Sequence, residues 1–197
     1  MDPARLVEKW FDNHDEDGDF LVCDRAQSFS IIGPTADSTW IIYSTKGHVT
    51  LPPVARYATA LDFGIICRCG LPSETDIHWL RGIIQTRELM FVGDMDPADT
   101  MIFAWLRARL QSIVVTHVGI NDRFLSKLGI SVPVSYRIRL GPAGTAAVSA
   151  LDNVLPDAND TLGRDCRRTL KEGYKIELEA VVSTIGNADP ILAAAIG

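Results

Sequence analysis

Two carboxylates near the middle of the chain have the types and spacing needed to hold a metal ion. Asp94 and Asp96 stand two positions apart, directly after the apolar run Leu89–Val92, and Pro97 follows them. The apolar run predicts a short buried strand, and Pro is favoured in the first turn of a helix. Both acids are therefore expected at the carboxyl end of a strand, where open α/β sheets bind their ligands. Such a pair suits Mg²⁺, which takes one or two protein carboxylates and keeps several waters.

The segment Asp94–Pro97 also has a plainer interpretation, which is an aspartate-rich turn between a strand and a helix. Asp caps helix N-termini, and Pro begins helices, in the absence of any metal. An isolated Asp-x-Asp-Pro does not distinguish these two readings, so the neighbouring segments have to decide between them.

A second candidate cation site lies near the N-terminus, after a helix predicted over residues 3–12. Five side chains there have the spacing of an EF-hand loop, and they are Asn13, Asp15, Asp17, Asp19 and Asp24. Gly18 stands where such a loop turns sharply, and oxygen ligands of this kind bind Ca²⁺. Against calcium, the first position is Asn, the last is Asp rather than Glu, and no exit helix or second hand follows. The alternative is a solvated acidic turn.

Strand and helix patterns alternate through the middle of the chain. Strands are predicted at 40–43, 63–67, 89–92 and 112–117, and helices at 52–61, 74–85, 97–110 and 121–128. This order predicts an α/β fold with a mainly parallel, four-stranded sheet and helices on both faces. Residues 1–38 are expected to hold the first helix and the acidic loop, with an irregular segment over 24–38, and 39–130 to form the α/β core. Residues 131–197 are expected to form a mostly helical extension packed on that core, with helices at 146–154, 161–170 and 175–184.

Composition narrows the class of protein. The chain has 197 residues, of which 47% are hydrophobic, and a formal net charge of −6. That charge argues against a free-standing, tight, nonspecific nucleic-acid binder, although it leaves room for a local basic face. No window resembles a membrane span or a signal peptide, and the four cysteines lack zinc-ligand spacing. We therefore expect a cytoplasmic protein with free thiols and no membrane partner.

Four segments, taken in order, resemble the Toprim domain of the type IIB topoisomerase A subunits and the related meiotic double-strand-break transesterases. They are Trp40–Gly47, Phe91–Pro97, His117–Gly129 and Leu170–Ala180, and together they span residues 39–184. They are similar to the family's first strand, its Asp-x-Asp-Pro, its segment after the fourth strand and its Lys-Ala-Glu-Ile-Gln-Ala helix. The resemblance implies a Toprim-like fold, Mg²⁺ at Asp94 and Asp96, and a role with DNA or with a nucleic-acid-processing partner protein.

The chain departs from this family at positions that matter for catalysis. The family carries a metal-binding Glu on its first strand, where Ser44 or Thr45 stands here and brings no charge to Mg²⁺. The family's tyrosine nucleophile lies on a separate winged-helix domain, for which the 38 residues before the first strand are too few. We therefore expect weak Mg²⁺ binding, with Lys46 paired to an aspartate in the metal's place. Glu177 matches the family by position only.

The sequence leaves three functions open, and the third depends on the acidic loop. The first is a Mg²⁺-dependent enzyme acting on DNA or RNA phosphodiesters. The second is a non-catalytic module that binds nucleic acid or a partner protein, which the missing Glu and tyrosine domain favour. The third is a calcium-responsive module built on residues 13–24.

Overall fold

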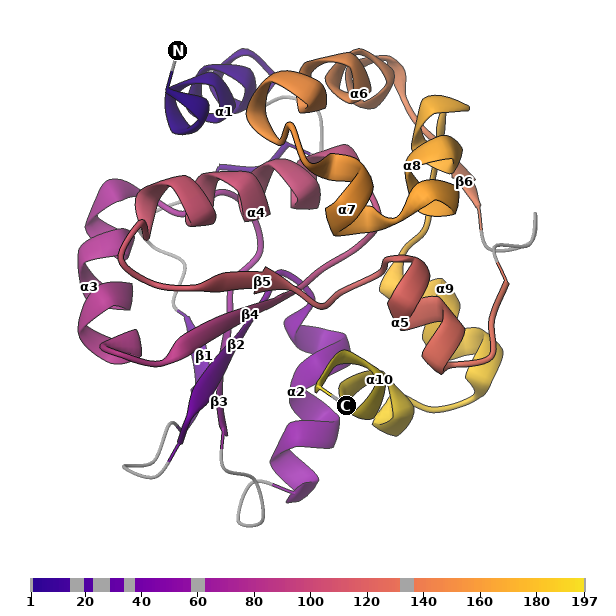
Figure 1. Cartoon of the computed structure of the whole chain (residues 1–197). Coiled ribbons are helices and arrows are strands. Elements are labelled where there is room, and N and C mark those ends of the chain that lie inside the picture. The colour runs from indigo at the N-terminus through magenta and orange to yellow at the C-terminus, as the bar shows by residue number, and fades with distance from the viewer. Residues whose placement is uncertain are drawn as a thin grey trace.

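A five-stranded, mostly parallel sheet lies at the centre of the molecule (Figure 1). The computed structural model describes residues 2–14, 20–22, 29–33, 38–57, 63–131 and 137–196. The strands are β1 (Ser30–Ile32), β2 (Trp40–Ser44), β3 (Phe63–Cys67), β4 (Glu88–Val92) and β5 (Val115–His117). Their spatial order is β1-β3-β2-β4-β5, and all neighbours are parallel except β1 and β3. The fold is therefore α/β and Rossmann-like, as the strand and helix alternation predicts.

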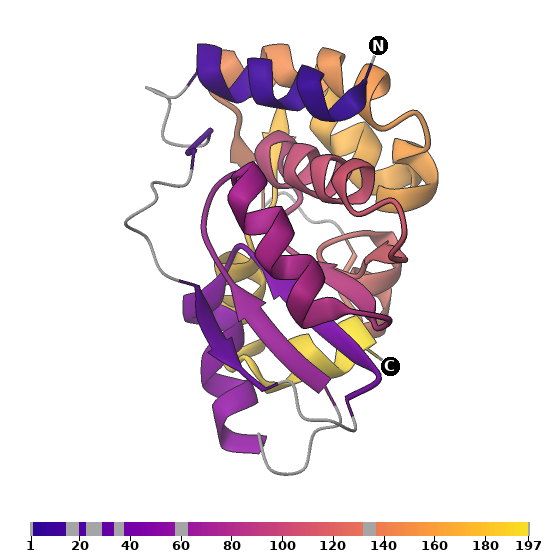
Figure 2. The ribbon, with the colours of Figure 1, turned by 90° about the vertical axis from the view of Figure 1, so that its left-hand side faces the viewer.

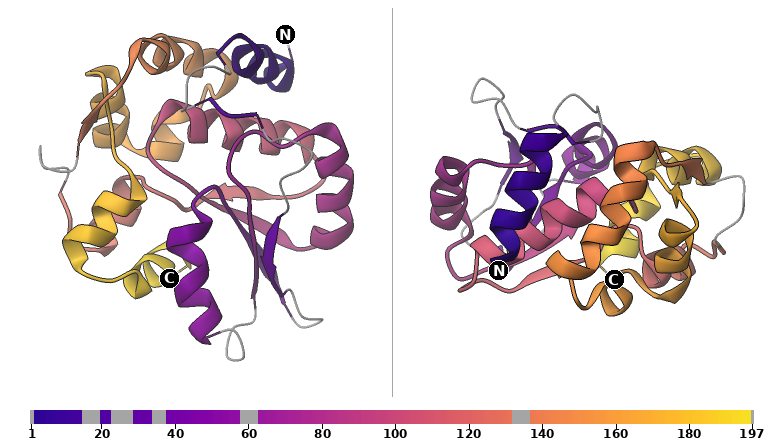
Figure 3. Two further views of the ribbon diagram at one scale, coloured as in Figure 1. Left: turned by 180° about the vertical axis from the view of Figure 1, so that it is seen from behind. Right: turned by 90° about the horizontal axis from the view of Figure 1, so that it is seen from above.

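Helices cover both faces of this sheet (Figures 1 and 3). The first four are α1 (Pro3–Asn13), α2 (Gly47–Tyr57), α3 (Glu74–Ile84) and α4 (Pro97–Arg109). The rest are α5 (Asp122–Lys127), α6 (Pro142–Val154), α7 (Ala158–Leu162), α8 (Arg164–Lys171), α9 (Leu178–Ile185) and α10 (Asp189–Ile196). α4 packs against α1 and α6, whereas α2 packs against α9 and α10. The chain after residue 137 therefore contributes helices to both sides of the sheet.

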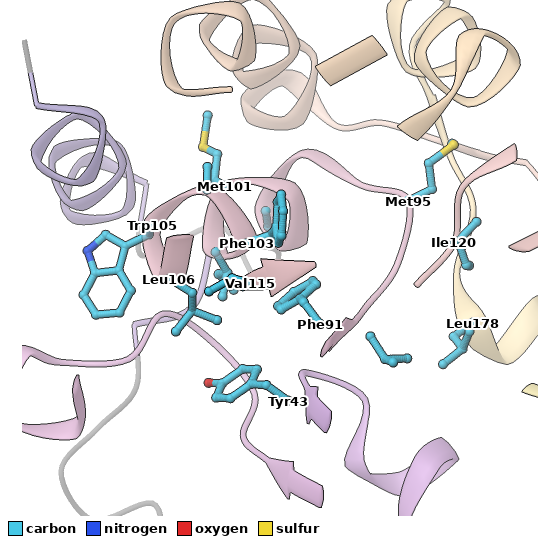
Figure 4. Close-up of a cluster of buried hydrophobic side chains, with 14 of the residues drawn as sticks. Tyr43, Phe91, Met95, Met101, Phe103, Trp105, Leu106, Val115, Ile120 and Leu178 are labelled. Atoms are coloured by element: carbon cyan, nitrogen blue, oxygen red, sulfur yellow. The ribbon is translucent and has the colours of Figure 1, made fainter. Parts of the chain in front are cut away.

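Helix α4 is the central helix of the core. Every residue from Pro97 to Leu106 is buried, because α4 lies between the sheet and the outer layer formed by α1 and α6 (Figure 2). Figure 4 shows Phe103 of this helix beside Phe91 of β4, and their ring centroids are 5.7 Å apart. From Met101 to Leu106 the helix is apolar on all sides, which is expected only where partners surround it. The acids at its N-terminus are held in place by that packing.

The sheet has one strand more than the four predicted. β1 pairs antiparallel with the edge of β3, with Ile31 opposite Ile66. The segment 24–38 was expected to be irregular because Gly33-Pro34 signals a turn. A strand of three residues on a sheet edge leaves little periodicity in the sequence, so this prediction was wrong for Ser30–Ile32.

Three further boundaries differ from the predicted ones. α2 begins at Gly47, so Pro52 and Pro53 lie inside the helix rather than at its start. Tyr174–Lys175 forms a short strand, β7, which pairs antiparallel with β6 (Ile138–Arg139), and the helix expected from 175 begins at Leu178. The helix expected over 161–170 is broken at Gly163, whose φ of +85° only glycine adopts readily. Within the described ranges, no helix has the length and apolar character needed to cross a bilayer.

Candidate functional site at the carboxyl edge of the sheet

The loops after β2 and β4 meet at the carboxyl edge of the sheet. These two strands are parallel neighbours, with Ser44 opposite Val92 at their ends. The chain leaves β2 towards β3 and leaves β4 towards β5, in opposite directions. A crevice forms at such a reversal of strand order, and ligands of open α/β sheets bind there. The segment Thr45-Lys46 therefore faces Gly93-Asp94.

Asp96 acts as the N-cap of α4. Its carboxylate accepts a hydrogen bond of 2.6 Å from the backbone N–H of Asp99, and Pro97 occupies the first helical turn. The Thr100 hydroxyl donates to the Asp96 carbonyl at 2.6 Å. Asp96, one of the two predicted metal ligands, is therefore a helix N-cap, as the plainer interpretation of the turn predicts.

A third acid, Asp99, joins the two predicted ones. Oxygens of Asp94, Asp96 and Asp99 lie within 4.8 Å of one another, and all three residues are buried. One Asp99 oxygen accepts hydrogen bonds of 2.7 Å from the Thr45 hydroxyl and from the Asp94 N–H. The sequence signal for Asp99 was its spacing of three from a helix N-cap, since that position faces back towards the cap. We refer to these three residues as the acidic cluster.

Lys46 is a cation that contacts the acidic cluster directly. Its Nζ lies 2.6 Å from Oδ2 of Asp94, and the side chains are 22% and 1% exposed. The backbone N–H of Leu178 donates to the other Asp94 oxygen at 2.7 Å. Donors therefore face both oxygens of Asp94, and these contacts favour its ionised form.

The electrostatics show more negative charge than Lys46 balances. Burial raises the pKa of Asp94 well above its ordinary value, and the charges of Asp99 and Asp96 add to this, whereas Lys46 opposes it. Burial also raises the pKa of Asp99, against the hydrogen bonds from Thr45 and the Asp94 amide. Burial disfavours the Lys46 ammonium, yet its ion pair with Asp94 raises its pKa overall. The ammonium is therefore held in place by the acids.

The C-terminal segment closes one side of the site. Met95 and Ile176 form an antiparallel bridge, with both N–H···O distances 3.0 Å. This bridge places Glu177 beside a cavity of about 90 Å³ that is also lined by the acidic cluster. Glu177 pairs with Lys175 at 3.2 Å and so brings no unbalanced charge. Glu179, which the sequence reasoning missed, lies 3.5 Å from Lys46 and 2.6 Å from Nε2 of His48.

The donor set fits a divalent cation only after rearrangement. Carboxylate oxygens are the ligands that Mg²⁺ prefers, and the excess negative charge favours a cation. Hydrogen-bond donors or Lys46 already occupy both oxygens of Asp94 and one oxygen each of Asp96 and Asp99. A metal ion would be held by Asp94 and Asp96, and it would have to displace Lys46.

Ser44, His117 and the candidate calcium loop lie in three different places. Ser44 accepts a hydrogen bond of 3.0 Å from the Lys46 N–H and orients the loop after β2. His117 packs against the rings of Phe91 and Phe103, and burial lowers its pKa to about 4. Of the calcium-loop positions, Asn13 is the last residue of α1. The other four lie outside the described residues, so calcium binding there stays a prediction, and they are Asp15, Asp17, Asp19 and Asp24.

The chain matches no model of a known protein family and no curated protein sequence.

Proposed function

We propose that this chain is a Toprim-like domain, related to the type IIB topoisomerase A subunits, that acts in association with DNA through a degenerate metal site. The observation that carries the proposal is the Lys46–Asp94 pair of 2.6 Å at the centre of the acidic cluster. The acids follow β4 at the reversal of strand order, which is where a Toprim-like domain would hold Mg²⁺. A tethered ammonium in that position supports weak Mg²⁺ binding.

The same site favours a non-catalytic role over phosphodiester cleavage. At the end of β2, where the family carries a Glu, Thr45 donates its hydroxyl to Asp99 and supplies no charge for a metal. An enzyme of this kind needs a cation to polarise the phosphate and stabilise the developing charge. Lys46 neutralises Asp94 instead, so the chain binds its DNA or its partner protein without cutting it.

Calorimetry with Mg²⁺ and Mn²⁺ tests the metal site. We expect wild type to bind either ion weakly and Asp94→Asn to bind neither. Lys46→Gln should bind more tightly than wild type, because the ion no longer has to displace an ammonium. The control for loss of one surface charge is Asp165→Asn, because the Asp165 side chain is 55% exposed and pairs with the exposed Arg168. Tight binding that survives Asp94→Asn would contradict the assignment of the site.

Plasmid incubation separates the module from the enzyme. We expect the protein to retard duplex or single-stranded DNA in a gel and to leave supercoiled plasmid intact with Mg²⁺ or Mn²⁺. Asp96→Asn is the matched variant, because Asn caps helices as well as Asp does and preserves the start of α4. Nicking by wild type that Asp96→Asn abolishes would establish the enzyme instead.

A further inference from the structure

A second cleft opens on the other side of Lys46, between the loops that follow β2 and β3. Its volume is about 430 Å³, and its polar lining comes from Ser30, Thr45, Lys46, His48, Arg68 and Cys69. This volume falls within the range of small-molecule sites in proteins. The cleft shares Thr45, Lys46 and Cys69 with the cavity over the acidic cluster, so the two hollows adjoin.

The lining of this cleft is basic, in a chain whose net charge is −6. Lys46, His48 and Arg68 contribute to it, and none of the described residues that line it is acidic. The three carboxylates that pair with these side chains lie outside the lining, and they are Asp94, Glu179 and Asp76. The two thiols add no negative charge, because burial raises the pKa of Cys67 to about 11 and also raises that of Cys69.

Helix α2 begins at this cleft, which its first two residues, Gly47 and His48, line. Gly47, its first residue, lines the cleft, and the helix runs for 11 residues. Free N–H groups and the helix dipole at such a terminus attract anions. Gly47 also allows close approach to β3, since an added Cβ would lie 2.9 Å from the Cβ of Cys67. The basic side chains and the start of α2 therefore lie at one opening.

We propose that this cleft binds a phosphate group, either of a nucleic-acid strand or of a free phosphomonoester. The Arg68 guanidinium is a planar fork that matches phosphate oxygens, and its NH1 donates to Asp76 at 2.7 Å, which fixes its orientation. Arg68 also lies over the ring of Phe29, 4.5 Å from its centroid. The guanidinium is thus positioned before any ligand arrives, and the exposed His48 also lines the cleft.

Lys46 links this cleft to the acidic cluster. A divalent cation at Asp94 and Asp96 would release the Lys46 ammonium towards the phosphate, so both ligands favour the same displacement. Linkage then requires that each ligand raise the affinity of the other by the same factor. This coupling rests on the proposed function, whereas the phosphate site itself does not.

Titration followed by NMR and calorimetry tests the phosphate site in the absence of divalent ions. Inorganic phosphate and a 5′-phosphorylated dinucleotide are the probes. We expect both to shift the backbone amides of Gly47 and His48. Arg68→Gln should weaken binding about tenfold, the effect of losing one charge-assisted hydrogen bond. Arg68→Gln would also break the ion pair with Asp76. A second variant, His48→Gln, changes an exposed residue and leaves the core intact. Arg139→Gln, on β6 outside the cleft lining, is the control and should bind as wild type does.

The arms of this experiment separate the possible failures. Shifts confined to residues outside the cleft, or affinity unchanged in both Arg68→Gln and His48→Gln, would overturn the phosphate site. Binding of inorganic phosphate with no binding of longer DNA would keep the cleft and reject the DNA-associated role. Addition of Mg²⁺ should tighten phosphate binding in wild type and leave it unchanged in Lys46→Gln. An equal gain in both proteins would reject the coupling through Lys46.

Discussion

Asp94 shows how a single buried residue sets both the stability and the ligand preference of its site. Lys46→Gln removes its cation and leaves the Asp94 carboxyl group, whose side chain is 1% exposed, without that counter-charge. Breaking a buried pair in this way costs about 3 kcal/mol, at the lower end of the measured range because Lys46 is partly exposed. We expect denaturant unfolding of Lys46→Gln to show this loss, and millimolar Mg²⁺ to restore part of it. The exposed Lys171→Gln should have no measurable effect, and an equal loss there would contradict the argument.

His117 gives a prediction for acid pH. Its ring is buried, and neither ring nitrogen has a hydrogen-bond partner among the described residues. Burial lowers its pKa to about 4 from an ordinary value near 6.5. Between these two values the unfolded chain takes up a proton that the folded chain does not, so stability falls as the pH falls through this window. The two values limit the loss to about 3 kcal/mol.

The variant His117→Phe isolates this contribution. A phenyl ring binds no proton and suits the neighbouring rings of Phe91 and Phe103. Asp94 and Asp99 titrate in both proteins, so their effects cancel in the difference. We expect the stability of wild type relative to His117→Phe to fall between about pH 6.5 and pH 4. A difference that is constant with pH would show that the His117 ring is not held neutral.

The residues of the site were only partly predictable from the sequence. Asp94 and Asp96 stand out because they interrupt an apolar run, and Lys46 because it follows a strand. Asp99 was missed because an acid in the first turn of a helix is common and satisfies the helix dipole without any ligand. Glu179 was missed because its place beside Lys46 depends on the bridge between Met95 and Ile176, a pairing 81 residues apart in the chain that no local pattern encodes.

At the scale of elements, Gly163 joins α7 to α8 under two constraints. Its φ is +85°, and an added Cβ would lie 2.3 Å from Cγ of Asp122. That carboxylate accepts hydrogen bonds from the N–H groups of Asp165 and Cys166, at 2.9 and 2.8 Å, and so fixes α5 against the start of α8. A methyl group at position 163 would push the Asp122 carboxylate away and so separate α5 from the start of α8.

Gly163→Ala is therefore expected to destabilise the fold more than Gly129→Ala does. Gly129 also has positive φ, +69°, but an added Cβ there would meet no atom within 4 Å. Gly129→Ala should cost about 1 kcal/mol for the backbone conformation alone. Gly163→Ala should cost about 2 kcal/mol more, because the steric clash also breaks the Asp122 cap. Equal losses in thermal unfolding would show that the cap does not hold α8.

Elements with local signals were predicted well, and those fixed by distant partners were not. β3 was predicted at its observed bounds, and Ser73 forms the capping box that begins α3. The start of α2 was misplaced because Pro was assumed to mark a first turn, whereas Pro52 lies in the second. β7 was missed because a two-residue strand has no periodicity, and only its partner β6 makes it a strand.

At the scale of the whole molecule, one question is whether residues 137–196 fold with the rest of the chain. The hydrophobic core is continuous, and it includes Phe11 of α1, Phe91 of β4, Leu151 of α6 and Ile191 of α10. The Met95–Ile176 bridge and the bond from the Leu178 N–H to Asp94 add polar contacts between the two parts. Elements that share one core are expected to unfold together.

This expectation can be measured without new labels. All four tryptophans, Trp10, Trp40, Trp79 and Trp105, precede residue 137, so their fluorescence reports the sheet, α1, α3 and α4. Far-ultraviolet circular dichroism also reports α6 to α10. We expect the two signals to give the same denaturation midpoint in wild type. Asp94→Asn, which removes the ion pair with Lys46 and weakens the link to Leu178, should lower both midpoints together. A dichroism transition that precedes the fluorescence transition would show instead that the C-terminal helices form a separate unit, and that the site is completed only when they dock.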